Sequence, residues 1–214
     1  DFGEYGFKGV KIETIGLILN GKKKLYNKVK FYSYANKNYI LQDQDYIIDS
    51  EFPYWLLYRN NFFDKICKKM KFGIFDFFRD RQITKKHTLN KGKIRVLKSR
   101  NISNNNILSL DGYDTYLNDI NNFVVSKYLN KKNTYLVPNL TYYPRACKLP
   151  ENCIVDGSAA LLFPKNDQKI NNKQLEFFAS EEFTSFYRIA RNFGTRSLNI
   201  DRNSIFFWGL KKVI

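Results

Sequence analysis

The sequence contains few of the residues that build metal sites, disulfides and common catalytic centres. It has one histidine, His87, and three cysteines, Cys67, Cys147 and Cys153, in 214 residues. A Ser-His-Asp triad or a site with several histidine ligands is therefore not expected, and His87 is interpreted as a loop residue. The odd number of cysteines and the lack of Cys-x-x-Cys spacing argue against a disulfide framework and a zinc site. These features favour a reducing, cytoplasmic setting.

Signals for a membrane, for secretion and for nucleotide hydrolysis are also missing. No stretch approaches the roughly 20 apolar residues of a membrane span, so no membrane partner is expected. The start, Asp1 to Glu4, is acidic where a signal peptide would be basic, and without an initiating Met we expect a piece of a longer polypeptide. No Gly-x4-Gly-Lys-Ser/Thr loop occurs. Carboxylate pairs such as Glu181 and Glu182 lack the following Glu-x-Lys of a metal-dependent nuclease, so we interpret them as surface acids.

What the sequence does contain is positive charge on a chain that can fold. There are 36 Lys and Arg against 20 Asp and Glu, which gives a formal net charge of +16. Hydrophobic residues make up 43% and aromatic residues 17%, which excludes an intrinsically disordered chain. A folded protein with this charge suits a polyanion, and nucleic acid is the commonest one inside cells. A ribosomal or membrane-surface role is the competing interpretation.

The positive charge is concentrated in residues 65–100, which hold thirteen basic and two acidic residues. An AT-rich genome can raise the lysine content, but it would not cluster the lysines in one segment. An Arg guanidinium can form two hydrogen bonds with guanine, and an Asn or Gln amide can form two with adenine. Asn is also a common turn residue. The candidate DNA contacts from this segment are Arg79, Arg81, Gln82, Lys85, Lys86, Lys91, Lys93, Lys98, Arg100 and, directly after it, Asn101.

The first 45 residues have the pattern of a sheet edge. Residues 12–19 are largely apolar and predict a buried strand. Asn20-Gly21 follows, which is a typical hairpin turn, and residues 25–34 would form the returning strand. Two strands are too few for an independent domain, so the rest of the sheet is expected elsewhere.

The middle of the chain changes to helical spacing. Apolar side chains recur every three or four residues from Trp55 to Met70, which predicts an amphipathic helix with Pro53 in its first turn and Gly73 as its carboxyl cap. Residues 74–84 are ambiguous between strand and loop. The alternation in residues 91–98 predicts a half-buried strand. A polar loop over residues 101–106 and a second helix near residues 120–128 are expected to follow.

The second half of the chain mixes strands and helices. Residues 134–140 and 153–163 predict strands, and 204–208 a last strand. Helical spacing from Leu175 to Ala190 predicts two helices, the second with Ser180 as its amino cap and Gly194 closing the run. The predicted fold class is mixed α/β, of the α+β type.

Several stretches resemble one family. Residues 1–19 are similar to the late part of the catalytic domain in adenine-specific DNA methyltransferases of type II restriction-modification systems. Further stretches are similar, in order, to the target-recognition region of these enzymes, and the likeness covers most of the chain. They are residues 78–84, 92–102, 137–145 and 156–165.

The resemblance implies a DNA-reading function without catalysis in this chain. Residues 1–45 would be the tail of the methyltransferase domain and residues 46–214 a target-recognition domain. Such enzymes bind S-adenosylmethionine through a glycine-rich turn after the first strand and hold the flipped adenine with an Asn/Asp-Pro-Pro-Tyr/Phe motif. Neither motif occurs here, since no Pro-Pro exists and the glycines at 3–9 precede a strand. The cofactor would therefore belong to the parent enzyme, and this chain would position the adenine for its catalytic domain.

The same resemblance extends the candidate contacts and leaves alternatives open. A restriction nuclease fused to or associated with the parent is a further expected partner, besides duplex DNA. One alternative is a specificity subunit of a multisubunit restriction complex, although no long heptad helix is present. The others are a stand-alone restriction nuclease and an RNA-binding protein. The candidate contacts in the second half are Asn139, Thr141, Arg145, Arg191 and Arg196.

Overall fold

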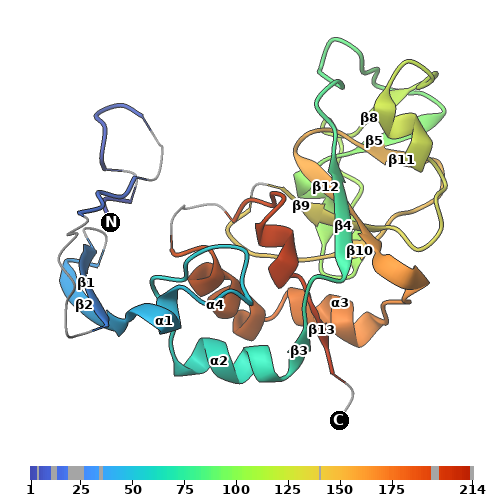
Figure 1. The fold of residues 1–214 in the computed structure, drawn as a ribbon. Coiled ribbons are helices and arrows are strands. Elements are labelled where there is room, and N and C mark those ends of the chain that lie inside the picture. The colour runs from blue at the N-terminus through green and yellow to red at the C-terminus, as the bar shows by residue number, and fades with distance from the viewer. Residues whose placement is uncertain are drawn as a thin grey trace. The chain divides into compact units, whose positions relative to one another are not determined.

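The chain has the mixed α/β composition that its sequence predicts, arranged as two compact units (Figure 1). The first unit combines Asp1–Lys68 with Phe186–Arg196, and the second combines Lys69–Ser185 with Ser197–Ile214. This division differs from the expected boundary at residue 45, because the sequence carries no signal for the return of residues 186–196 to the first unit. The computed structural model describes residues 1–3, 5–10, 14–18, 27–33, 36–139, 141–193 and 198–212.

The first unit contains a two-stranded antiparallel hairpin and short helices. The hairpin alternates, so Phe31 faces inward while its neighbour Tyr32 is exposed. Phe63 is fully buried and stacks on Phe186 with ring centroids 4.8 Å apart. Arg59 binds two carboxylates, Asp49 at 2.7 Å and Asp64 at 2.8 Å. The elements are β1 (Lys28–Ser33), β2 (Asn38–Asp43), α1 (Gln44–Ile47), α2 (Asn61–Lys68) and the end of α4 (Glu181–Ala190).

Two predictions for the first unit are wrong. Residues 15–18 form no strand, and Ile18 is 97% exposed, because no neighbouring strand covers this segment among the described residues. The helix predicted from residue 53 begins only at Asn61, where the side chain of Asn60 accepts a hydrogen bond from the Phe63 amide at 3.0 Å. It ends at Lys68, so Gly73 is not its cap. The Asn20-Gly21 turn lies outside the described residues.

The second unit is built on two main sheets. The antiparallel sheet has the order β10-β9-β12-β4, which Figure 1 shows side by side. The other sheet has the order β11-β5-β8, with β5 parallel to β11 and antiparallel to β8. The strands are β4 (Phe75–Arg79), β5 (Ile94–Leu97), β8 (Thr115–Leu117), β9 (Tyr135–Pro138), β10 (Cys147–Lys148), β11 (Cys153–Val155) and β12 (Ala159–Pro164).

Apolar side chains from both sheets share one core. Leu136 and Leu161 pair across β9 and β12, and Val96 and Ile154 pair across β5 and β11. All four are buried at the centre of the unit. Because β12 is flanked by strands on both sides and is covered, its sequence is a continuous apolar run. The predicted strands at 91–98, 134–140 and 153–163 are therefore confirmed, the last as two strands.

Helices α3 (Asn172–Phe178) and α4 confirm the helical spacing of the second half. Ser180 caps α4, since its hydroxyl accepts a hydrogen bond from the Phe183 amide at 3.1 Å. Phe178, Phe183 and Trp208 form an aromatic cluster with ring centroids 4.8 to 5.0 Å apart. The predicted strand at 204–208 is wrong, because this segment is the 3-10 helix η4 (Ser204–Phe207). Gly194 lies outside the described residues.

Short elements complete the second unit. The polar loop predicted at 101–106 contains a small hairpin, and the helix predicted near 120–128 is a single 3-10 turn. Strand β3 pairs with β13 near the end of the chain. The short elements are β3 (Met70–Lys71), η1 (Ser99–Asn101), β6 (Ile102–Ser103), β7 (Asn106–Ile107), η2 (Val124–Tyr128), η3 (Lys165–Asp167) and β13 (Leu210–Lys211).

The three cysteines are free thiols, in agreement with their spacing. Burial raises the pKa of the Cys147 thiol to about 12, and burial raises the pKa of Cys67 to about 12 as well. Nucleophilic chemistry at these thiols is disfavoured because the thiolate is the reactive form. In the described part of the chain, no helix has the length and apolar character that crossing a membrane requires.

Candidate nucleic-acid interface

Five of the eleven predicted Lys and Arg contacts lie on one loop, residues 80–93, which joins β4 to β5 and is called the basic loop below. Asp80 shapes its start, since one carboxylate oxygen accepts hydrogen bonds from the amides of Gln82 at 3.0 Å and Ile83 at 2.7 Å. Ile83 is buried in the core and anchors the loop to the unit. His87 is an exposed loop residue, as its isolation predicts, and its Nδ1 accepts from the Thr84 amide at 3.1 Å.

The cations of the basic loop face solvent without partners. Among the described residues, none of these side chains forms a salt bridge within 4.0 Å of a carboxylate. Exposed cations that no acid neutralises keep their full attraction for phosphate groups. The loop is therefore the strongest candidate surface for a polyanion on this unit. The five exposed cations are Arg81, Lys85, Lys86, Lys91 and Lys93.

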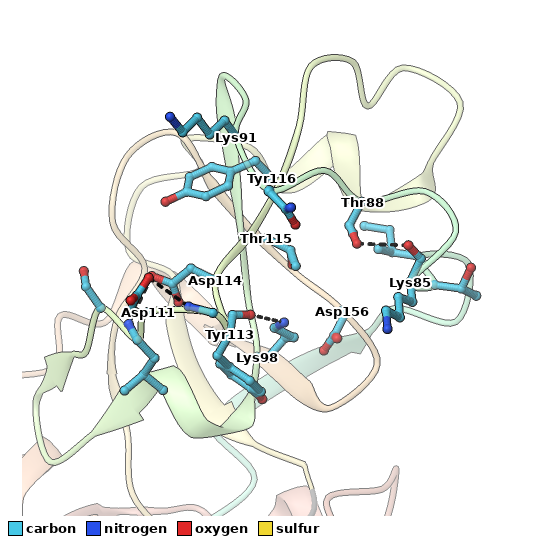
Figure 2. Close-up of a pocket in the computed structure, with 16 residues that line it drawn as sticks. Lys85, Thr88, Lys91, Lys98, Asp111, Tyr113, Asp114, Thr115, Tyr116 and Asp156 are labelled. Atoms are coloured by element: carbon cyan, nitrogen blue, oxygen red, sulfur yellow. Dashed lines mark hydrogen bonds between the residues drawn. The ribbon is translucent and has the colours of Figure 1, made fainter.

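The basic loop borders a cavity of about 1020 Å³ (Figure 2). Residues 109–116 also line it, and they comprise a turn and the first two residues of β8. Three lysines and three aspartates line the cavity, so its interior is balanced in charge although the surrounding loop is basic. These six are Lys85, Lys91, Lys98, Asp111, Asp114 and Asp156, and the other lining residues are Ile83, Thr84, Thr88, Asn90, Ser109, Leu110, Gly112, Tyr113, Thr115 and Tyr116.

A buried ion pair fixes the wall of the cavity. Asp114 accepts hydrogen bonds from Arg95 at 2.6 Å, from Asn101 at 2.6 Å and from the Leu110 amide at 3.2 Å. Burial alone would raise the pKa of the Asp114 carboxyl, but these hydrogen bonds outweigh it and hold the pKa below its usual range. Asp114 is therefore an anion at neutral pH, and its charge is compensated by Arg95 rather than offered to a ligand.

Asn101 and Lys98 were sequence candidates for DNA contacts, and the structure gives both an internal role. Asn101 is fully buried, and its amide also donates to the Leu108 carbonyl at 3.1 Å and accepts from the Lys98 amide at 2.9 Å. A direct contact of Asn101 with a base does not fit this placement. The Lys98 ammonium donates to the Tyr113 carbonyl and lies 4.0 Å from the centre of the Tyr113 ring. Arg100 is exposed and lies over the same ring at 4.9 Å.

Arg145 and Thr141 also face inward. The Arg145 guanidinium donates to the carbonyls of Ile102 and Ser99 and to the Thr141 hydroxyl, the last at 2.9 Å. Burial lowers the pKa of Arg145, and Thr141 is buried. Both residues were candidates for DNA contacts. The Arg145 guanidinium and the Thr141 hydroxyl are already hydrogen-bonded within the protein, so a direct contact of either side chain with a base does not fit their placement. Arg145 instead joins the chain around β10 to the turn that follows β5.

Replacing Arg145 with Lys should lower the free energy of unfolding by about 2 to 3 kcal/mol, because one ammonium cannot reach both the carbonyls of Ser99 and Ile102 and the Thr141 hydroxyl on a separate segment. Urea unfolding followed by circular dichroism measures this change. Arg202→Lys is the matched control, since Arg202 is exposed, and it should leave the free energy of unfolding unchanged. Equal stability of the two variants would contradict the joining role of Arg145.

Arg79 and Asn139 form a third internal contact. Arg79 Nε donates to the Gly157 carbonyl at 2.9 Å. With its amide oriented to satisfy both polar atoms, Asn139 accepts from the Arg79 guanidinium at 3.0 to 3.2 Å and donates to the Ile200 carbonyl at 3.1 Å. Asn139 is fully buried, so the predicted adenine contact does not fit, whereas Arg79 remains exposed. Gly157 is required here because a Cβ would stand 2.9 Å from the Asp80 carbonyl oxygen.

The remaining candidates are dispersed. Gln82 is exposed, and its side-chain oxygen accepts from the Val124 amide at 2.7 Å. Arg191 is half-buried in the first unit, beside Tyr54, Trp55 and Asn192 in a smaller hollow. The structure therefore does not assemble Arg191 into the cavity of the second unit. Arg196 lies outside the described residues.

Comparison with known proteins does not assign this chain to a family. No family model and no curated protein matches this chain. Within the described residues, no cluster of three or more His, Cys, Asp and Glu side chains could hold a metal ion.

Sequence reasoning missed the residues of the cavity wall. Tyr113, Thr115, Tyr116 and Asp156 line the cavity, but none was a candidate. A signal existed in Asp111-Gly112 and Asp156-Gly157, two turn sequences that place a carboxylate at the end of a loop. The spacing between these turns gives no indication that they meet, because 45 residues separate them.

Proposed function

We propose that the second unit binds double-stranded DNA through the basic loop and reads a short sequence. The observation that carries the proposal is the set of five exposed, unpaired cations on one loop beside a cavity. Cations on such a loop can contact successive phosphates and release their counterions, which gives strong and salt-dependent binding. Two exposed arginines, Arg81 and Arg100, add the guanidinium geometry that pairs with guanine, whereas the guanidinium of Arg79 is occupied by Gly157 and Asn139.

The biological setting that we propose is an adenine-specific DNA methyltransferase of a restriction-modification system. The support is the resemblance of residues 78–84, 92–102, 137–145 and 156–165 to target-recognition regions, together with the basic loop, which connects the first two of these stretches. The chain would orient the target adenine for a catalytic domain of the parent polypeptide, which binds S-adenosylmethionine. A restriction nuclease is the further partner in this setting. Three free thiols suit a reducing cytoplasm.

Selection against a random duplex library at near-physiological salt tests this proposal. Enrichment of one short motif that contains an adenine is the expected result, and it would identify the target site in the same experiment. Retention of DNA without any enriched motif would contradict sequence reading by this chain and leave only phosphate contact. Preferred retention of single-stranded RNA in a parallel library would favour the RNA-binding alternative.

A further inference from the structure

Arg100 is held in place by an aromatic ring and not by hydrogen bonds of its guanidinium. The guanidinium nitrogens of Arg79, Arg95 and Arg145 donate to oxygen atoms of the protein. Arg100 is exposed, and its side chain donates no hydrogen bond to any described residue. It lies over the Tyr113 ring, with the guanidinium carbon 4.9 Å from the ring centre. The donors of Arg100 are therefore available to a ligand.

The contact between Arg100 and Tyr113 stands on a buried scaffold. The residues that follow them in the chain are Asn101 and Asp114, which are joined by a hydrogen bond of 2.6 Å. Asn101 is fully buried and also accepts from the Lys98 amide at 2.9 Å, while the Lys98 ammonium donates to the Tyr113 carbonyl. Both contacting residues are thus fixed through their neighbours, so the guanidinium is positioned before a ligand binds.

The two other exposed arginines of the second unit, Arg81 and Arg202, lack this support. Neither lies over an aromatic ring of the described residues, and neither forms a salt bridge with them. A long side chain that is free in solution loses conformational freedom when it binds, and this loss reduces its contribution to affinity. Arg100 has already lost part of that freedom, so it is the arginine best prepared for a specific contact.

We infer that Arg100 reads one guanine in the major groove of the bound DNA and that Tyr113 is the residue that positions it. Guanine presents two neighbouring acceptors on its major-groove edge, O6 and N7, and a guanidinium donates to both at once. Adenine presents an acceptor beside a donor, cytosine a donor, and thymine one acceptor. Two donors side by side therefore distinguish guanine from the other three bases. This inference rests on the proposed DNA binding and adds a base that the recognised sequence contains.

The surroundings of Arg100 connect this contact with the basic loop. Lys98 lies 4.0 Å from the centre of the same Tyr113 ring, and Figure 2 shows the two residues side by side in the lining of the cavity. Lys85 and Lys91 of the basic loop line the same cavity. A duplex whose phosphates contact the basic loop therefore lies within reach of Arg100 as well.

Selection against a random duplex library, repeated with variants, tests the role of Arg100. The motif enriched by the unaltered chain should contain one strongly preferred guanine. Arg100→Lys keeps the charge but loses the planar pair of donors, so preference for this guanine should fall about tenfold. The other positions of the motif and the salt dependence of binding should not change. Arg202→Lys is the matched control, since Arg202 is exposed, and it should keep every preference.

Two variants of Tyr113 test the positioning role. Tyr113→Phe keeps the ring beside the guanidinium and should keep the preference for guanine. Tyr113→Leu keeps an apolar side chain without a ring, so this preference should fall about two- to fivefold while the salt dependence stays the same. The bond from Lys98 to the Tyr113 carbonyl involves the main chain and survives both substitutions. Thermal unfolding of both variants checks that they fold.

The possible outcomes separate the inference from the proposed function. An enriched motif without a guanine, or unchanged base preference in Arg100→Lys, would overturn the role of Arg100 while sequence reading still stands. Equal losses in Tyr113→Phe and Tyr113→Leu would overturn the positioning role of the Tyr113 ring. Absence of any enriched motif with the unaltered chain would overturn both the inference and the proposed sequence reading.

Discussion

Neutralising the basic loop should weaken binding to duplex DNA by at least about a hundredfold. The variant replaces Arg81, Lys85, Lys86, Lys91 and Lys93 with Gln, and these five side chains are exposed and unpaired, so the fold should not change. Each phosphate contact contributes about 0.9 to the slope of log affinity against log salt. The slope should therefore fall by about 4 if most of the five contact phosphate. Fluorescence anisotropy over a series of salt concentrations measures both effects.

A matched variant separates local contact from net charge. It replaces five exposed lysines of the same unit outside the basic loop, so both variants lose the same charge. The control should retain most of its affinity because long-range attraction is screened by salt. Equal loss of affinity in the two variants would contradict the assignment of the basic loop as the binding surface. The control positions are Lys127, Lys132, Lys148, Lys169 and Lys173.

Replacing Asp114 with Ala should lower the free energy of unfolding by about 3 to 5 kcal/mol. The side chains of Arg95 and Asp114 are only 17% and 14% exposed, so the variant leaves the charge of Arg95 largely buried without a carboxylate, with the Leu108 carbonyl at 2.7 Å as its remaining hydrogen-bond partner. It also leaves the Asn101 amide with fewer hydrogen bonds. Urea unfolding with linear extrapolation gives the change. Asp119→Ala, at an exposed carboxylate, is the control and should be nearly neutral.

The difference between the unaltered chain and Asp114→Ala should depend on pH. The pKa of Asp114 is lower in the folded chain than its ordinary value of 3.8. Its contribution is therefore fully present above that ordinary value and is lost as the pH falls through the folded pKa. The two free energies of unfolding should differ most at neutral pH and converge in acid. A difference that stays constant down to low pH would contradict an ionic role for Asp114.

The elements that sequence predicts well are those with local causes. Strand β12 is a continuous apolar run, and α4 begins at Ser180 with acids in its first turn. The predictions that are wrong depend on contacts between residues that lie far apart in the sequence. Trp55 and Tyr58 have helical spacing, but they lie in an irregular segment before α2, and Tyr58 is buried by side chains such as Phe31 and Phe193. Periodicity cannot distinguish these arrangements, because tertiary contacts decide between them.

For the candidate site, too, the sequence predicts local features but not tertiary contacts. Clustering of Lys and Arg is visible without a structure, because charge density is a property of the sequence. The direction in which a side chain points cannot be read from the sequence in the same way. Asn101, Asn139 and Arg145 therefore resemble base-reading residues by type, although in the structure they hold the fold together. Asp156 and Thr115 come from distant segments, and only the folded chain brings them to one cavity.

The return of residues 186–196 to the first unit affects the order of folding during synthesis. Phe63 needs Phe186, the Tyr54 hydroxyl donates to the Ala190 carbonyl at 2.7 Å, and the Leu57 amide donates to Asn192 at 2.8 Å. A ribosome releases residues 1–68 long before these partners exist. Folding from the amino end, which is usual for consecutive domains, is therefore not open to this chain. Its first unit must stay incomplete, with its apolar side chains uncovered, until residues 186–196 have been synthesised.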